Sequence, residues 1–91
     1  MTTSANELRT FRIKSGYNEK QVAAILGIKS PDTITRWENG ETMPSTIYAL
    51  AMGDLYGAKL PDLFPTLWKK CMREINERLK ILKKKKEIAK L

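Results

Sequence analysis

A chain of 91 residues can fold one small globular domain with an appendage, but it is too short for a two-domain enzyme. It contains no histidine and a single cysteine, which excludes histidine-dependent catalytic triads, histidine-ligated metal sites and intramolecular disulfides. The formal net charge is +7, so we expect an anionic partner. Residues 66–91 account for all of this charge with ten basic and three acidic side chains, whereas residues 1–65 carry seven of each, so the chain has two electrostatically different parts.

The first helix is predicted to begin at Ser4, because a serine followed three residues later by a glutamate, here Glu7, can satisfy the free amide groups of a helix start. Leu8 and Phe11 lie three apart, as on one face of a helix. The pattern ends near Ser15, before a glycine. These signals predict a short amphipathic helix.

A second helix is predicted after Asn18, which forms a capping pair with Gln21. Gly27 ends this helix, because glycine readily adopts the positive φ of a helix C-terminus. Its core-facing side is predicted from the i, i+3, i+4 spacing of Val22, Ile25 and Leu26.

A third helix is predicted after Ser30, with Pro31 at the first helical position, an arrangement typical of a helix start. Ile34 and Trp37 lie three apart and are predicted to face the core. Asn39, followed by a glycine, supplies the stop.

A fourth helix is predicted from Pro44 and Ser45 to about Gly57, with Gly53 expected to weaken it. Its core-facing stripe is predicted to consist of Ile47, Leu50, Ala51 and Leu55. A last short turn before Pro65 is predicted to pack Leu60, Leu63 and Phe64 against the core. No segment alternates with period two, so the predicted fold class is all-α, with five helices within residues 1–65.

Residues 66–91 are predicted to form a long basic amphipathic helix with about two heptads of a coiled-coil seam. The seam consists of Trp68, Met72, Ile75, Leu79 and Leu82. Two interpretations are open: the seam packs on its own domain, or it meets a second copy or another protein. The lysines at 83–86 are either a solvated end or a phosphate-binding cluster. Cys71, beside the seam, is expected to stay reduced.

Several short motifs between residues 6 and 64 together form a pattern of fixed order and spacing. They are Leu8-x-x-Phe11-Arg12, Gly16-Tyr17-Asn18, Val22-Ala23, Leu26-Gly27, Ile34-Thr35-Arg36-Trp37-Glu38-Asn39-Gly40, Pro44-Ser45 and Leu63-Phe64. This pattern resembles the lambda-repressor and Cro-like, or XRE-type, helix-turn-helix family. The resemblance implies a five-helix DNA-binding domain without a cofactor, which reads near-palindromic operators as a homodimer. It also implies an ion pair between Arg12 and Glu38 that ties the first helix to the end of the third.

In such a module the third helix enters the major groove, and the side opposite Ile34 and Trp37 is left to meet base edges. The candidate base contacts are Ser30, Asp32, Thr33, Thr35 and Arg36. Arg36 is the strongest candidate, because a guanidinium can pair bidentately with guanine, and Asp32 can accept from cytosine N4. The candidate phosphate contacts, which set the register, are Asn18, Lys20, Gln21, Asn39 and Thr42.

Two features depart from the family pattern. One additional residue lies between Gly27 and Ile34, and it either lengthens the turn or shifts the start of the third helix. Glu19 stands where the family commonly has a glutamine that meets the DNA backbone, and phosphates repel its charge. The repulsion between Glu19 and phosphates predicts a weaker affinity for DNA than the family pattern implies.

These observations predict a non-enzymatic, sequence-specific regulator that binds double-stranded DNA, either a dimeric repressor or a control protein of a plasmid, phage or mobile element. The alternative function is an adaptor that binds a partner protein through its C-terminal helix. A membrane-surface role is disfavoured, because the apolar face of that helix is short and interrupted. No apolar run approaches the roughly 18 residues of a membrane span and no secretory signal is present, so we expect a cytoplasmic protein.

Overall fold

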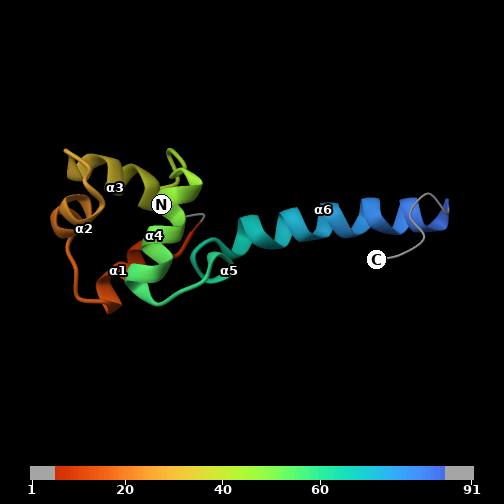
Figure 1. Ribbon diagram of the computed structural model, residues 1–91, viewed down its shortest axis with the longest axis horizontal. Helices are drawn as coiled ribbons and strands as arrows, with labels where there is room; N and C mark the ends of the chain where they lie inside the picture. Colours follow the sequence, from red (N-terminus) through yellow and green to blue (C-terminus); the bar gives the residue numbers. More distant parts are fainter. Residues whose placement is uncertain (1–5, 86–91) are drawn as a thin grey trace.

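The computed structural model describes residues 6–85, which form six α-helices and no β-strand (Figure 1). The helices are α1 (Leu8–Lys14), α2 (Glu19–Leu26), α3 (Pro31–Glu38), α4 (Thr46–Tyr56), α5 (Leu60–Leu63) and α6 (Pro65–Lys84). The first five form a bundle, and α6 projects from it as a long rod (Figure 1). The predicted all-α class, with five helices and a long additional helix at the C-terminal end, is confirmed.

The start of α1 differs from the prediction. The helix begins at Leu8, and Glu7 occupies the N-cap position without a side-chain cap hydrogen bond. Ser4, the predicted cap, lies outside the described residues. The Leu8 amide instead donates to Asn6 Oδ1 at 3.0 Å. The asparagine therefore satisfies one of the free amide groups at the start of α1.

The predicted ends of α2 and α3 are confirmed. The Gln21 amide donates to Asn18 Oδ1 at 2.7 Å and the Asn18 amide donates to Gln21 Oε1 at 2.9 Å, which completes a capping box. Gly27 ends α2 with a φ of 73°. Ser30 caps α3, which begins at Pro31 after a turn of residues 27–30.

The core lies inside the bundle of α1–α5. Its buried apolar residues are Leu8, Val22, Ala23, Ile34, Trp37, Ala49, Met52, Tyr56, Leu63 and Phe64. The prediction for Ile25 was wrong, since this side chain is exposed. Val22 and Ala23 form the buried side of α2, and Leu26 is only partly buried.

The predicted core-facing stripe of α4 was wrong for Ile47 and Leu50, whereas Leu55 packs against the core and Ala51 is partly buried. Ile47 and Leu50 are 78% and 55% exposed, whereas Ala49, Met52, Gly53 and Tyr56 are buried. Apolar residues surround most of this helix, so hydrophobicity alone does not select its inner side. The close approach at Gly53 does select it, because a Cβ there would lie 2.7 Å from the Ala58 carbonyl oxygen.

Helix α6 begins directly after α5 and leaves the bundle, so that the described chain measures 52 × 29 × 22 Å (Figure 1). None of its residues is buried. The helix is described to Lys84, with Lys85 as its C-cap, so Lys86 of the predicted lysine cluster lies outside the described residues. None of the helices within residues 6–85 is long and apolar enough to cross a membrane.

Candidate nucleic-acid interface

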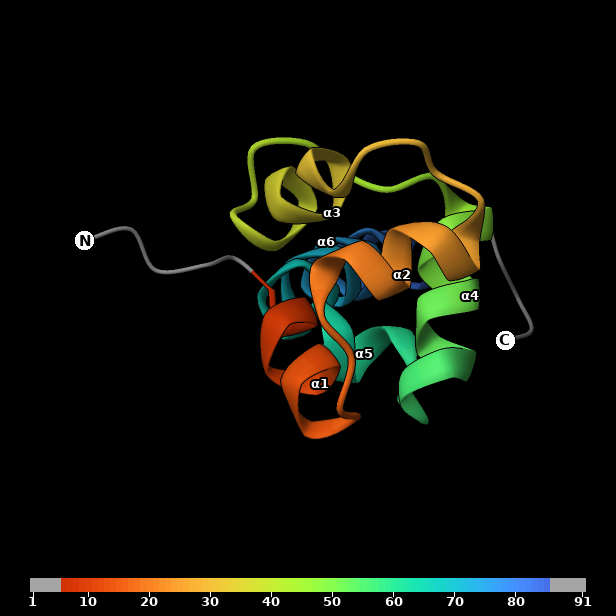
Figure 2. The same cartoon turned by 90° about the vertical axis from the view of Figure 1, so that its left-hand side faces the viewer.

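Helix α3 lies on the outside of the bundle and is joined to α2 by the turn of residues 27–30 (Figure 2). Ile34 and Trp37 are buried and form its inner side. The ring of Trp37 packs against that of Tyr48 on α4, with the centroids 5.5 Å apart. This packing fixes the rotation of α3, so the opposite side of the helix faces away from the bundle.

The five predicted base-contact residues differ in solvent exposure. Asp32 and Arg36 are exposed, and the other three are half-buried. The Ser30 hydroxyl accepts from the Asp32 amide at 3.2 Å, and the Thr35 hydroxyl donates to Glu19 Oε2 at 2.5 Å. The Arg36 side chain makes no hydrogen bond or ion pair within residues 6–85, so its five N–H donors are available.

All five predicted phosphate-contact residues are exposed, at the start of α2 and after α3. The side chains of Asn18 and Gln21 use only their oxygen atoms in the capping box. Both side-chain NH₂ groups therefore remain free to donate to an anion. Lys20 lies between them on α2, while Asn39 and Thr42 follow the end of α3.

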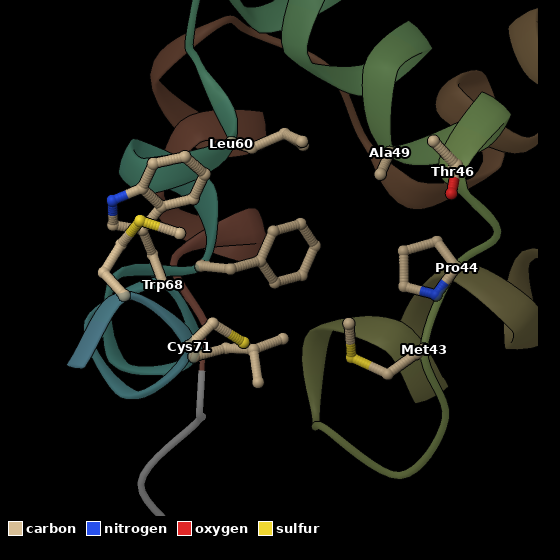
Figure 3. A pocket seen from close by; sticks show the side chains of 10 residues that line it. Met43, Pro44, Thr46, Ala49, Leu60, Trp68 and Cys71 are labelled. Atoms are coloured by element: carbon tan, nitrogen blue, oxygen red, sulfur yellow. The ribbon is translucent and has the colours of Figure 1, made fainter. Parts of the chain in front are cut away.

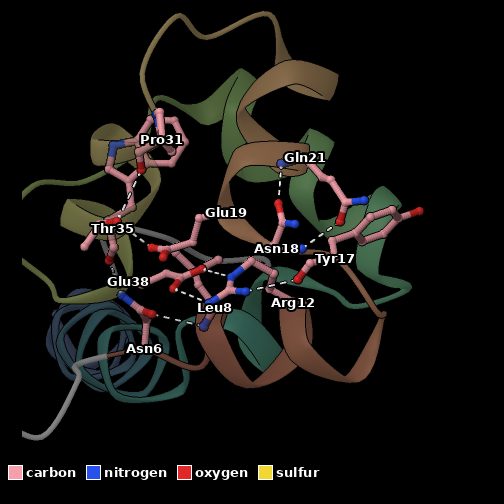
Figure 4. A network of polar contacts seen from close by, with 11 residues as sticks. Asn6, Leu8, Arg12, Tyr17, Asn18, Glu19, Gln21, Pro31, Thr35 and Glu38 are labelled. Atoms are coloured by element: carbon pink, nitrogen blue, oxygen red, sulfur yellow. Dashed lines mark hydrogen bonds and ion pairs between the residues drawn. The ribbon is translucent and has the colours of Figure 1, made fainter.

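A buried ion pair between Arg12 and Glu38 ties α1 to the end of α3, as expected (Figure 4). Arg12 donates from Nε to Glu38 Oε2 at 2.6 Å and from Nη2 to Glu38 Oε1 at 3.1 Å. A third donor, Nη1, reaches the carbonyl oxygen of Tyr17 at 3.0 Å. The hydrogen bond to Glu38 is the main cause that raises the pKa of Arg12, so this side chain stays charged.

A model of the helix-turn-helix family matches residues 8–63, which is more than half of the chain. The chain belongs to the helix-turn-helix family. The expected XRE-type, lambda-repressor-like resemblance is thereby confirmed, and with it membership of a family of DNA-binding transcription regulators. No curated protein and no solved structure matches the chain.

The two helices of the helix-turn-helix are linked by a contact that the sequence did not reveal (Figure 4). Glu19, at the first position of α2, is half-buried and accepts the hydrogen bond from Thr35 on α3. It also lies close enough to Arg12 to contribute to the raised pKa of the guanidinium. The carboxylate expected to face phosphates is therefore also an internal link that sets the position of α3 on α2.

Asn6 is the second such link. Its Nδ2 donates to the carbonyl oxygen of Trp37 at 2.8 Å, while its Oδ1 accepts from Leu8. The residue is buried, so both hydrogen bonds are shielded from water. Its type and its place two residues before a helix are typical of a capping side chain, so the sequence could have identified its hydrogen bond with Leu8 but not the one with Trp37.

The helix-turn-helix and the far end of α6 lie at opposite ends of the described chain (Figure 1). In the view of Figure 2, α6 runs away behind the bundle while α3 stays on its outside. As far as Lys85, the basic arm of the chain therefore does not cover the outer side of α3.

Proposed function

We propose that the protein is a sequence-specific regulator of transcription that represses by occupying its operator in double-stranded DNA. The proposal is carried by the outer side of α3, where the Arg36 side chain is exposed and makes no hydrogen bond or ion pair within residues 6–85. The opposite side of the helix is held by Ile34 and Trp37 in the core. A helix positioned in this way can present its side chains to base edges with little loss of conformational freedom.

Each exposed residue has a role that follows from its chemistry. Arg36 donates two hydrogen bonds to the O6 and N7 atoms of a guanine, and Asp32 accepts one from the N4 atom of a cytosine. Lys20 and the free NH₂ groups of Asn18 and Gln21 donate to phosphates and set the register. Ser30, Thr33 and Thr35 are nearer the bundle and are proposed as secondary contacts.

The homodimer expected from the sequence is a separate proposal. Two copies on one operator would place their α3 helices on half-sites about 34 Å apart, one turn of DNA, and the selected operators would be near-palindromic. We do not assign this contact to α6, because basic residues flank its seam.

Selection of bound sites from a random duplex pool tests the function. The intact chain is expected to enrich one motif. Arg36→Ala should lose discrimination at one base pair by about 1 to 3 kcal/mol. Lys20→Ala is the matched control, because it removes the same charge from an exposed phosphate-contact position. It should weaken binding to all sequences alike and lower the salt slope by about one.

Two outcomes would contradict these assignments. If the intact chain enriches no motif above background, the proposed function as a DNA-binding regulator is wrong and the adaptor function gains support. If the intact chain enriches a motif and Arg36→Ala selects the same motif with the same stringency, the regulator stands but Arg36 does not read a base.

A further inference from the structure

The apolar seam of α6 is uncovered along most of its length. Within residues 6–85 the helix packs mainly against α5, at its own first turns. Trp68 and Ile75 of the seam are 41% and 51% exposed. The other three seam residues, Met72, Leu79 and Leu82, are only partly buried. A continuous apolar stripe of this kind on a monomer is typical of an interaction surface.

The seam runs into a groove at the base of α6, with a volume of about 290 Å³ (Figure 3). Trp68 and Cys71 border it on the side of α6, and Met43 and Pro44 border it on the side of the segment before α4. Trp68 belongs to both the seam and the groove. A helix lying along the seam could therefore insert one large apolar side chain at this end, as anchor residues of helical partners do.

The charges beside the seam indicate which kind of helix can cover it. In a heptad with the seam at a and d, the flanking e and g positions of α6 are Lys69, Cys71, Asn76, Arg78, Lys83 and Lys85. Four of them are cations and none is acidic. Glu74 and Glu77 fall at the c and f positions, away from the seam. Charges at e and g select the partner in helix pairing, and within residues 6–85 none of these cations has an ion-pair partner.

This distribution disfavours the other occupants of the seam. In a parallel pair of copies, Arg78 of one faces Lys83 of the other, and in an antiparallel pair Lys69 faces Lys83, so like charges meet in both orientations. DNA phosphates would neutralise the cations but leave the apolar side chains in water. Outside the seam only Leu67 and Ile81 are exposed large apolar residues on the described part of α6, so the apolar face is narrower than that of a helix that lies on a membrane.

We infer that α6 and its groove bind an acidic amphipathic helix of a different protein. The partner helix has its own apolar seam, flanked by Asp or Glu at the positions that face the four cations. Its apolar residues cover the stripe, and one of them enters the groove beside Trp68. This inference goes beyond DNA recognition and does not depend on it, because the seam and the groove share no residue with the proposed DNA contacts.

Two fluorescently labelled synthetic helical peptides test the inference with the full chain. Both have leucine and isoleucine in the seam, and one has glutamate while the other has lysine at every e and g position. Binding is measured by fluorescence anisotropy without DNA. The glutamate peptide is expected to bind at least tenfold more tightly, and the difference should shrink as salt is raised. Trp68→Ala should weaken its binding at least tenfold, because it removes one side of the groove.

A charge-matched pair of variants separates local complementarity from net charge. Arg78→Glu with Lys83→Glu leaves two cations and two anions beside the seam and should abolish the preference between the peptides. Lys70→Glu with Lys84→Glu makes the same change in net charge at f positions, on the opposite side of α6, and should keep the preference. All four side chains are exposed, so the fold of the bundle is not disturbed.

Equal binding of the two peptides, or binding of neither, would overturn the inference. So would a dimer of the chain alone in sedimentation equilibrium that Ile75→Glu converts to a monomer, because a second copy would then cover the seam. Tighter binding to anionic vesicles than to the glutamate peptide would overturn it in favour of a membrane surface. Site selection on random duplexes is independent of all these outcomes, so failure of this inference and failure of DNA recognition are distinguishable.

Discussion

Replacement of Arg12 by methionine tests whether the buried ion pair is what holds α3 on α1. The guanidinium makes two hydrogen bonds to Glu38 and one to the Tyr17 carbonyl oxygen, and both members of the pair are buried. Methionine retains most of the length and apolar volume of the arginine side chain, so packing changes little. The variant therefore removes mainly the charge and the three hydrogen bonds.

The expected loss is large relative to the total stability. Removing one member of a buried pair lowers the free energy of unfolding by about 3 to 5 kcal/mol, because the other charge stays buried without its partner cation. A domain of this size has about 5 to 13 kcal/mol in all. Since 1 kcal/mol shifts the Tm of a domain of this length by about 4 to 8 °C, we expect the Tm to fall by at least about 12 °C.

Urea and thermal unfolding followed by circular dichroism measure this loss. Arg9→Met is the matched control, because Arg9 lies on the same helix, is exposed and makes no ion pair within residues 6–85. Its effect should stay within about 0.5 kcal/mol. The double variant of Arg12→Met and Glu38→Met should be less destabilised than the sum of the two single variants, because the two side chains are in direct contact.

The reasoning fails if Arg12→Met loses less than about 1 kcal/mol, or no more than Arg9→Met, since the pair would then contribute no more than a surface charge. Additive effects in the double variant would likewise show that the two side chains are not coupled. As long as Arg12→Met is folded at the assay temperature, it should select the same operator motif as the intact chain, because the pair lies beneath α3 and not on its outer side.

Three further changes have expected outcomes. Gly53→Ala should lower the free energy of unfolding in urea by about 1 to 3 kcal/mol, because the new Cβ would lie 2.7 Å from the Ala58 carbonyl oxygen; a gain, as helix propensity alone predicts, would contradict the close packing. Burial raises the pKa of Tyr56 to about 12, so the folded state holds the phenolic proton more tightly than the unfolded state. The free energy of unfolding should therefore fall by about 2 to 3 kcal/mol as the pH rises from about 10 to 12. Tyr56→Phe should lose this alkaline decline, and an unchanged pH profile would exclude Tyr56 as its cause. Glu19→Gln should bind duplex DNA several-fold more tightly than the intact chain at low salt, and this gain should shrink at high salt. The amide can still accept the hydrogen bond from Thr35, but it no longer repels phosphates. Unchanged affinity would show that the carboxylate lies too far from the DNA backbone.

Features set by neighbouring residues were predictable from the sequence. The capping box of Asn18 and Gln21, the cap at Ser30 and the left-handed Gly27 each depend on a few consecutive positions, and the structure confirms all three. The inner side of α3 was predictable as well, because only Ile34 and Trp37 are apolar at helical spacing on an otherwise polar helix.

Features set by packing between distant segments were not predictable. On α4 apolar residues occupy nearly every position, so the periodicity that identified the inner side of α3 is absent there. The side that faces the core carries the buried Ala49 and Gly53, and at Gly53 the absence of a Cβ leaves room for the Ala58 carbonyl oxygen and for the Leu63 side chain. Likewise, the hydrogen bonds of Glu19 to Thr35 and of Asn6 to Trp37 join residues 16 and 31 positions apart, and no local pattern specifies them.

The net charge of the chain is a poor guide to where it would contact bases. Residues 1–65 are neutral overall, and within them the charges of Arg12 and Glu38 cancel inside the bundle. The excess cations lie within residues 66–91, and seven of these ten basic residues belong to α6, a helix of 20 residues that extends about 30 Å from the bundle. At 0.1 M salt, charges are screened over about 10 Å, so the cations at the far end of α6 act weakly at the bases that α3 would contact. Base recognition would therefore depend on a few side chains of α3, chiefly Arg36 and Asp32. The cations at the far end of α6 are instead placed to contact the acidic partner helix proposed for the seam.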